Sequence, residues 1–396
     1  MMDAARYFDW AATSPADEDV LRESLEEAMR SWANPSSAHN AGIEARNALE
    51  SARKRAADAI GVKESQLFFT SGGTESDHIP LLSLLARPGA MSQKGRIVVS
   101  AIEHPALREQ CAAMGRLGFD VKTVAPDRNG FVTAEAIREA ITPDTLFVTV
   151  MAVNNETGCI QPFEEIADAI TEWYGGKRKP HFHVDCVQAA GKIPLDIAHK
   201  GIDSAAFSAH KISGPRGIGL LYMAHPEKFK GFLVGGGQEK NVRSGTENLF
   251  GAIAFAKVLE KHYIRKGADG EAAERLRAQK EMTAHFIEEL SKNSAFTPVP
   301  ERRTERAGEF SPWVVQASFK GIPGNVMVRA LDAKGFAIST GSACSAKKQS
   351  RPILEAMGSS REVQDTAVRF SFGHLTTEEG MLALAKAVGE ICADFS

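Results

Sequence analysis

The chain has 396 residues, a length that predicts two or three domains. Its 47 basic and 50 acidic side chains give a formal charge of −3, which argues against a broad basic face for nucleic acid, and 43% hydrophobic residues argue against disorder. No stretch approaches the roughly 20 continuous apolar residues of a membrane helix, and residues 1–9 lack the apolar block of a signal peptide. We therefore expect a cytosolic (cytoplasmic) protein without membrane or nucleic-acid partners.

Helical and strand-like segments alternate over the first 250 residues. Three helices are expected, at 16–31 with Asp17 as a candidate N-cap, at 41–60 ending at Gly61, and at 75–86. Short apolar runs between helical spacers predict strands at 66–70, 96–100, 145–150, 181–185 and 205–208. This order predicts an α/β fold, with a mostly parallel sheet that carries helices on both faces.

From about residue 251 the pattern changes. We expect one or two long helices at 251–293, followed by an exposed loop at 298–309. A strand is expected at 314–319, and two further helices at 325–334 and 378–393. These elements predict a second, smaller α+β domain. We expect a large domain over 16–255 and a small domain formed by 1–15 and 256–396.

The five cysteines include no C-x-x-C pair, and their odd number excludes complete disulfide pairing. In a reducing compartment each of them is a thiol. Four are expected to be small core residues, namely Cys111, Cys159, Cys186 and Cys392. The fifth, Cys344, lies among small residues instead.

A polar, glycine-rich segment, Thr70-Ser71-Gly72-Gly73-Thr74-Glu75, follows the first predicted strand and opens a predicted helix. Glycines let a backbone approach an anion closely, and the first N–H groups of a helix favour negative charge. The segment lacks the G-x-x-x-x-G-K-[ST] pattern of a P-loop. We interpret it as a phosphate cradle, with a simple helix-capping turn as the alternative.

The strand 181–185 places His181, His183 and Asp185 on one face, because side chains alternate along a strand. Three interpretations are open: a metal site, a strand-end carboxylate that pairs with a ligand cation, or a structural strand with hydrogen-bonded histidines. No second ligand cluster is spaced to complete a metal site, so no metal is assigned.

Lys211 follows the strand 205–208, within Ser208-Ala209-His210-Lys211-Ile212-Ser213-Gly214-Pro215. A lysine rarely lies among small residues at a strand end without a partner, and partial burial would make its amine nucleophilic. A solvated surface lysine is the alternative.

The phosphate cradle, Asp185 and Lys211 together match the needs of pyridoxal 5'-phosphate. This cofactor requires an anion site, a carboxylate for its pyridine nitrogen and a lysine for a Schiff base. A dinucleotide site would have to use Gly214-x-x-Gly217-x-Gly219, where both the spacing and the position are wrong.

Long and uncommon motifs occur in order through nearly the whole chain. They are Tyr7-Phe8-Asp9, Asn34-Pro35-Ser36-Ser37-Ala38-His39, Glu103-His104-Pro105-Ala106, Asn154-Asn155-Glu156-Thr157-Gly158, Gly235-Gly236-Gly237-Gln238-Glu239, Arg243-Ser244-Gly245-Thr246-Glu247-Asn248 and Arg369-Phe370-Ser371-Phe372-Gly373. In these motifs the chain resembles the pyridoxal-phosphate-dependent cysteine desulfurases of the NifS/IscS type, in the class V aminotransferase family. The resemblance implies the fold type I architecture of such transferases.

The resemblance also implies roles for single residues. In the ring site, Lys211 forms the Schiff base, Asp185 pairs with the pyridine nitrogen, Gln188 bonds the ring hydroxyl beside Asn155, and His104 stacks on the ring and moves protons. The phosphate is held by Gly73, Thr74, Ser208 and His210. Thr246 reaches the phosphate of the neighbouring subunit, which implies a homodimer. Arg369, together with Asn155, binds the substrate carboxylate.

Cys344 decides the expected reaction. Its neighbours, Ser339-Thr340-Gly341-Ser342-Ala343 and Ser345-Ala346, are small and suit an accessible nucleophile. The resemblance implies that Cys344 takes the sulfur of L-cysteine as a persulfide, leaves L-alanine, and passes the sulfur to an iron–sulfur scaffold or a tRNA-thiolation carrier. The alternatives are a selenocysteine lyase, an aminotransferase, or a catalytically silent sulfur-transfer scaffold.

Three residues depart from the family pattern. Trp10 stands where the family has asparagine, and it is expected near the site entrance, where it would affect substrate access. His78 also replaces an asparagine. Cys186 replaces an alanine next to Asp185 and is expected to be inert packing.

Overall fold

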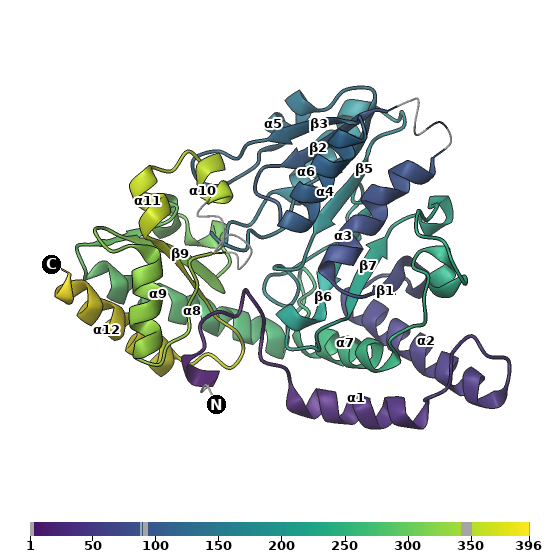
Figure 1. Ribbon diagram of the computed structural model, residues 1–396, viewed down its shortest axis with the longest axis horizontal. Coiled ribbons are helices and arrows are strands. Elements are labelled where there is room, and N and C mark those ends of the chain that lie inside the picture. The colour runs from purple at the N-terminus through teal and green to yellow at the C-terminus, as the bar shows by residue number, and fades with distance from the viewer. Residues whose placement is uncertain (1–3, 88, 90–93, 342–350, 396) are drawn as a thin grey trace.

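The structure, a computed structural model, describes residues 4–87, 89, 94–341 and 351–395. Within these residues the chain forms two lobes that lie side by side (Figure 1). One is built on a seven-stranded mixed sheet and the other on a three-stranded antiparallel sheet. The predicted fold class, a mostly parallel α/β lobe joined to a smaller α+β lobe, is confirmed.

The large sheet has the strand order β1-β7-β6-β5-β4-β2-β3. These strands are β1 (Leu67–Thr70), β2 (Arg96–Ser100), β3 (Asp120–Val124), β4 (Thr145–Thr149), β5 (His181–Asp185), β6 (Ser204–Ser208) and β7 (Gly219–Met223). Only β7 runs against its two neighbours among these strands, so the other six share one direction. The carboxyl ends of β1, β2, β4, β5 and β6 therefore meet at one edge, where ligands bind in open α/β sheets.

Helices cover both faces of this sheet because its buried residues alternate between them. On one face, Ile97 and Val99 pack against α3 (Gly73–Leu82) and α4 (Pro105–Arg116). On the other face, Val98 and Val148 join a large core. That core receives side chains from α2 (Asn40–Ile60), α5 (Ala134–Ala140), α6 (Phe163–Tyr174) and α7 (Leu249–His262), and α1 (Glu18–Arg30) packs on α7. Asp17 caps α1 and left-handed Gly61 ends α2, as predicted.

The small lobe holds a separate core around the sheet β10-β9-β8. Its strands are β8 (Phe296–Pro298), β9 (Val314–Phe319) and β10 (Ala367–Ser371), and its helices are α8 (Glu271–Ser291), α9 (Gly324–Ala333), α10 (Pro352–Ala356), α11 (Arg361–Thr366) and α12 (Glu378–Asp394). Phe8 from the N-terminal segment also belongs to this core. Figure 1 shows α8, α9 and α12 beside β9, at a distance from the large sheet.

Two details differ from the sequence-based expectations. The expected boundary at 255/256 falls inside α7, whose Val258 and Leu259 belong to the large core, so we propose to divide the domains between α7 and α8. The segment 298–309 is not a simple exposed loop: it forms two 3-10 turns and buries Arg303, which donates to Ser311 O at 2.8 Å. In the described part of the chain, no helix combines the length and apolarity needed to cross a bilayer.

A buried ion pair ties the loop that precedes Thr246 to α2. The Glu239 carboxylate accepts hydrogen bonds from Arg53 Nη1 at 2.7 Å, Arg53 Nη2 at 2.8 Å and Phe69 N at 2.8 Å. Both side chains are almost fully buried. The pair fixes the loop against the first strand of the sheet.

Replacing Glu239 with alanine is expected to lower the free energy of unfolding by about 3–5 kcal/mol, because Arg53 would stay buried without its partner. Denaturant unfolding measures this loss. Glu50→Ala is the matched control: Glu50 also contacts Arg53, at 3.1 Å, but its side chain is 46% exposed. Its expected cost is below about 1 kcal/mol, and equal losses in the two variants would contradict the anchoring role of Glu239.

Candidate active site

The loops that follow five parallel strands bring the predicted residues to one edge of the large sheet. The cradle at Gly73 follows β1, His104 follows β2, Asn155 follows β4, Asp185 ends β5, and Lys211 follows β6. Gly73 and Lys211 thus share one site although they are 138 positions apart in the sequence. The topology of the sheet, not local sequence, assembles the group.

Lys211 ends a short 3-10 turn, Ala209–Lys211, directly after β6. Its Nζ donates to Ala11 O and to Ala12 O, each at 2.8 Å. The backbone of the same N-terminal segment is bound to this turn, because Ser14 N donates to His210 O at 2.8 Å. The segment 9–14 is therefore a wall of the site, which sequence reasoning missed because carbonyl contacts leave no trace in residue type.

Asp185 is buried at the end of β5, and its Oδ1 accepts from Val187 N at 2.8 Å. Burial raises the pKa of its carboxyl group to about 8, and Asp77 acts in the same direction, while Val187 N–H, His183 and Lys211 act against it. A cationic nitrogen placed beside this carboxyl would favour the ionised form. The residue therefore fits the pyridinium nitrogen of the expected cofactor.

Replacing Asp185 with asparagine is expected to stabilise the cofactor-free protein, and more so as the pH rises. The unfolded carboxyl ionises near its ordinary value of 3.8, whereas the folded group keeps its proton until about pH 8. The free energy of unfolding of the wild type therefore decreases as the pH rises from 3.8 to about 8. Asparagine does not ionise, so the variant does not lose this stability.

Denaturant unfolding at pH 5 and pH 8 measures the difference, which should grow to the order of a few kcal/mol. The same variant should bind the cofactor more weakly than the wild type. A stability difference that does not change with pH would contradict the raised pKa of Asp185.

Below Asp185, the histidines of β5 form a buried hydrogen-bonded chain. His183 Nε2 lies 3.1 Å from Asp77 Oδ1, and Ser204 Oγ lies 2.7 Å from His183 Nδ1 and 2.6 Å from His181 Nε2. Burial lowers the pKa of each histidine to about 4. Among the described residues, no group of three or more His, Cys, Asp and Glu side chains is placed to hold a metal ion. Of the three interpretations of this strand, the geometry favours hydrogen-bonded histidines below a ligand carboxylate.

The cradle is formed where α3 begins. A Cβ on Gly73 would lie 2.7 Å from Val187 Cγ2 and 3.5 Å from Ser208 Cβ, so any side chain here would crowd Val187. Thr74 is exposed, and the first N–H groups of α3 have no intrahelical partner. His210, whose Nδ1 lies 3.1 Å from Thr13 Oγ1, is on the turn after Ser208. This donor set fits a phosphate.

His104 is the N-cap of α4, and its Nδ1 accepts from Ala106 N at 3.2 Å. Burial lowers its pKa to about 4, with a further contribution from the charge of Lys211. The ring is therefore neutral at neutral pH, and its proton lies on Nε2 because Nδ1 accepts. A neutral ring can stack on a cationic cofactor ring without electrostatic cost.

Arg369 lies on β10 and is almost fully buried. Its Nη2 donates to Asp9 Oδ1 at 2.7 Å and its Nη1 to Asn155 O at 2.9 Å. Arg369 Nε and Asn155 Oδ1 are buried polar atoms that have no hydrogen-bond partner within the described structure. Asp9, which was not predicted as a site residue, therefore holds one side of the guanidinium group.

The remaining predicted site residues differ in where the structure places them. Gln188 is buried and its Nε2 donates to Ala11 O at 2.9 Å, beside Lys211. Thr246 is exposed and does not line the groove that contains Thr74. Cys344 lies outside the described residues. The residues that precede its segment lie at the site: Ser339 pairs with Arg369, and a Cβ on Gly341 would lie 2.7 Å from Glu156 Oε2.

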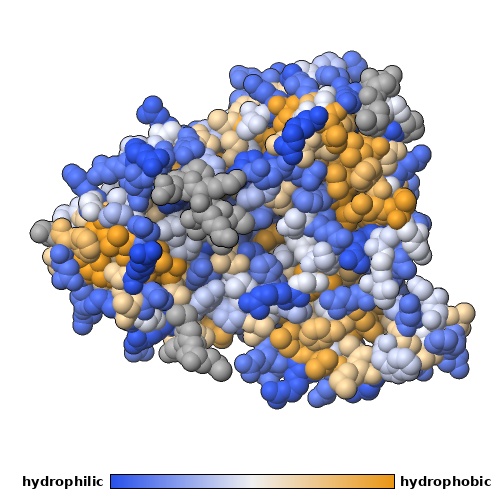
Figure 2. Space-filling view, viewed as in Figure 1, coloured by the Kyte–Doolittle hydropathy of each residue, from blue (hydrophilic) through white to orange (hydrophobic). Residues whose placement is uncertain are grey.

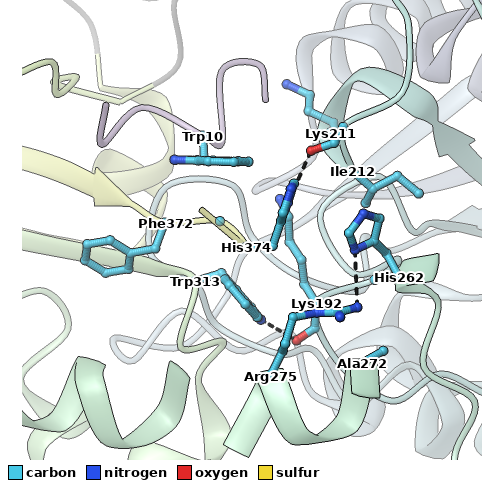
Figure 3. A pocket seen from close by; sticks show the side chains of 13 residues that line it. Trp10, Lys192, Lys211, Ile212, His262, Ala272, Arg275, Trp313, Phe372 and His374 are labelled. Carbon is cyan, nitrogen blue, oxygen red and sulfur yellow. Dashed lines mark hydrogen bonds between the residues drawn. The ribbon is translucent and has the colours of Figure 1, made fainter. Parts of the chain in front are cut away.

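Trp10 is a buried wall residue, not an entrance residue as expected. Its ring packs edge-on against His374 at 5.4 Å, and a Cβ on Gly373 would lie 2.0 Å from Trp10 Cε3. Figure 3 shows it across the pocket from Lys192 and Trp313. His78 bonds Ala106 O at 2.9 Å, and burial raises the pKa of the Cys186 thiol, which fits inert packing.

Comparisons with known proteins agree with this geometry. Residues 6–384 match the family described as aminotransferase class-V. Proteins named cysteine desulfurase IscS are 35% identical to the chain: one from Dictyoglomus turgidum over 377 residues (95% of this chain, 91% of that protein) and one from Methanosarcina thermophila over 389 residues (98% and 92%).

Solved structures give the same result. A NifS-like protein superposes with a TM-score of 0.85 at 32% identity and covers 100% of both chains. SspA in complex with cysteine has a TM-score of 0.79 at 28% identity, covering 94% of this chain and 100% of that one.

The chain therefore belongs to the class-V aminotransferase family. It is an enzyme that depends on pyridoxal phosphate, and its similarity within the family is to the cysteine desulfurases of the NifS/IscS type.

Proposed function

We propose that this enzyme is a cysteine desulfurase, which removes sulfur from L-cysteine, releases L-alanine and carries the sulfur as a persulfide on Cys344. The observation that carries the proposal is the meeting of Lys211, the buried Asp185 and the Gly73 cradle at one edge of the sheet. The names of the relatives support L-cysteine as the substrate.

When bound, the cofactor supplies a cationic ring that withdraws electrons from the substrate α-carbon. Asp185 would keep the ring nitrogen cationic, and neutral His104 would cover the ring. The phosphate would be held by Gly73, Thr74, Ser208 and His210. Lys211 Nζ would hold the cofactor, and with substrate bound its amine would take the α-proton.

The substrate carboxylate is proposed to bind between Arg369 and Asn155. Both offer buried polar atoms without partners in the described structure, which a carboxylate and an ordered water would satisfy. The Cys344 thiolate attacks the substrate sulfur: an S–S bond forms, the C–S bond breaks, and its electron pair passes to the carbon that becomes the alanine methyl group. The pairing of Ser339 with Arg369 supports delivery of this thiol to the same place.

A homodimer is also proposed, on the basis of exposed apolar side chains. Leu25, Met29 and Trp32 form a stripe along and just past α1, with exposed fractions between 50% and 80%. Figure 2 shows apolar residues gathered over the region of α1 and α7. Phe232 and Leu233 are exposed too, in the groove that contains Thr74. A second copy that covers these residues fits the implication of the family resemblance that Thr246 of one subunit reaches the phosphate of the other.

Trp32→Ser is expected to weaken dimerisation by about 30-fold or more, because exposed tryptophans at interfaces are frequent hot spots. Sedimentation over a concentration series measures the dissociation constant. Trp173→Ser is the control, since Trp173 is also exposed but lies on α6. Equal effects of the two substitutions would contradict this dimer face.

The finer assignments remain proposals of the same kind. The sulfur acceptor is proposed to be an iron–sulfur scaffold or a tRNA-thiolation carrier, and the cytoplasmic location stays a prediction from the sequence. The test of the function is to incubate the cofactor-loaded protein with L-cysteine and to assay L-alanine and protein-bound persulfide together. Equimolar formation of both supports the proposal; alanine without persulfide would refute it.

A further inference from the structure

A second lysine lies beside the proposed cofactor site, and no role has been given to it. Lys192 follows β5 on a turn in which Lys192 N donates to Ala189 O at 3.0 Å and Ile193 N to the same oxygen at 3.1 Å. This turn places Lys192 four residues after Gln188, and the two side chains meet: Lys192 Nζ donates to Gln188 Oε1 at 2.7 Å.

Lys192 is almost fully buried, which is rare for a lysine. Among the described residues, no carboxylate forms an ion pair with it. Burial lowers its pKa to about 7, and the positive charges of Lys211 and Arg369 act in the same direction. Burying the Lys192 amine without a carboxylate partner lowers the stability of the protein. A lysine at this position is therefore expected to have a role in the site.

The contacts of Gln188 show what that role can be. A side-chain amide has an oxygen and an NH2 group of nearly equal size, and only its partners decide which way it points. Here one end meets the carbonyl oxygen of Ala11, at 2.9 Å, which can only accept. The other end meets the amino group of Lys192, which donates to it at 2.7 Å and in its ammonium form can only donate. The NH2 group therefore faces Ala11 O, to which Lys211 Nζ also donates, and the oxygen faces Lys192.

We propose that Lys192 is a positioning residue for the cofactor: its buried amino group donates to the Gln188 amide oxygen and holds the amide in one orientation, so that the NH2 group faces the proposed ring site as a donor. The inference rests on the proposed function, because it needs pyridoxal phosphate to occupy the site next to Lys211. Without Lys192 only the Ala11 carbonyl orients the amide, so its orientation is fixed less strongly. An amide that turned over would face its oxygen towards the electron-rich oxygen of the ring hydroxyl.

The side chain can be tested apart from the backbone of the same residue. Trp313 Nε1, from the small lobe, donates to Lys192 O at 2.7 Å, as Figure 3 shows. That bond survives any replacement of the side chain. Methionine has a similar length and flexibility but no donor, so Lys192→Met removes the ammonium group with little change in packing.

The experiment is a double-mutant cycle on cofactor affinity. Equilibrium dialysis of pyridoxal phosphate against cofactor-free protein gives dissociation constants for the wild type, Lys192→Met, Gln188→Ala and the double variant. Lys192→Met is expected to weaken binding by about tenfold, the effect of losing one hydrogen bond to a charged group, and to shift the visible absorbance of the bound cofactor. In the Gln188→Ala background the same change should have no further effect.

Three results would overturn the inference: an unchanged affinity of Lys192→Met, an equal loss in both backgrounds, or an absorbance shift that persists without Gln188. Lys200→Met, at an exposed lysine, is the matched control and should bind as the wild type does. If Lys192→Met does not fold, Lys192→Gln is compared in both backgrounds, since an amide can donate or accept and no longer fixes one orientation. A wild type that fails to bind pyridoxal phosphate would refute the proposed function itself.

Discussion

Replacing Lys211 with alanine is expected to abolish the Schiff-base absorbance band of the bound cofactor and to slow alanine formation from L-cysteine by about 10³-fold or more. The amine has two tasks in the proposed reaction, since it attaches the cofactor and then removes the α-proton. The methyl side chain of the alanine variant can do neither. Absorbance spectra of the loaded protein and a single-turnover assay of alanine measure the two losses separately.

The variant should still bind pyridoxal phosphate without a covalent bond. The cradle at Gly73 and the carboxylate of Asp185 do not depend on Lys211, so dialysis should recover a weaker but measurable complex. Lys230→Ala is the matched control, because Lys230 is exposed and lies on the loop after β7. An unchanged spectrum of Lys211→Ala would mean that another amine, such as that of the buried Lys192, holds the cofactor.

Much of the large lobe was predictable because its strands are short buried runs between amphipathic helices. The predicted strands at 96–100 and 181–185 match β2 and β5 residue for residue. β3 was missed, since it is an edge strand whose residues are mostly exposed and polar. β7 was missed as well, and its antiparallel direction could not have been found, because side-chain alternation is the same for both directions of a strand.

The site was predictable to the extent that its residues follow strand ends. Lys211, Asp185 and the Gly73 cradle stand in polar clusters that interrupt apolar runs, and the sheet brings them together. Lys192 had no such signal, because its partner is set by a turn and its burial by distant residues such as Trp313. Asp9 was part of a recognised motif, yet its contact with Arg369 joins residues 360 positions apart.

Replacing Cys344 with alanine is expected to leave the cofactor spectrum unchanged and to abolish persulfide formation, with alanine release slowed by about 10³-fold or more. Cofactor contacts are proposed at the strand ends of the large sheet, so they do not involve this thiol. The substrate sulfur, however, has no other accessible cysteine thiol among the described residues to accept it, because the four other cysteines are all buried. Spectra, alanine assays and mass spectrometry of the protein distinguish these outcomes.

The control for this variant must remove a thiol without touching the site. Cys392→Ala does so, because Cys392 is buried on α12 in the small-lobe core and burial raises its pKa, which disfavours the reactive thiolate. Its activity should stay within about twofold of the wild type, the effect expected of a modest core change. If Cys344→Ala formed as much persulfide as the wild type, a different cysteine would have to be the sulfur acceptor. Cys186, next to Asp185, would then be the nearest alternative, and its raised pKa is the reason to expect that it is not used.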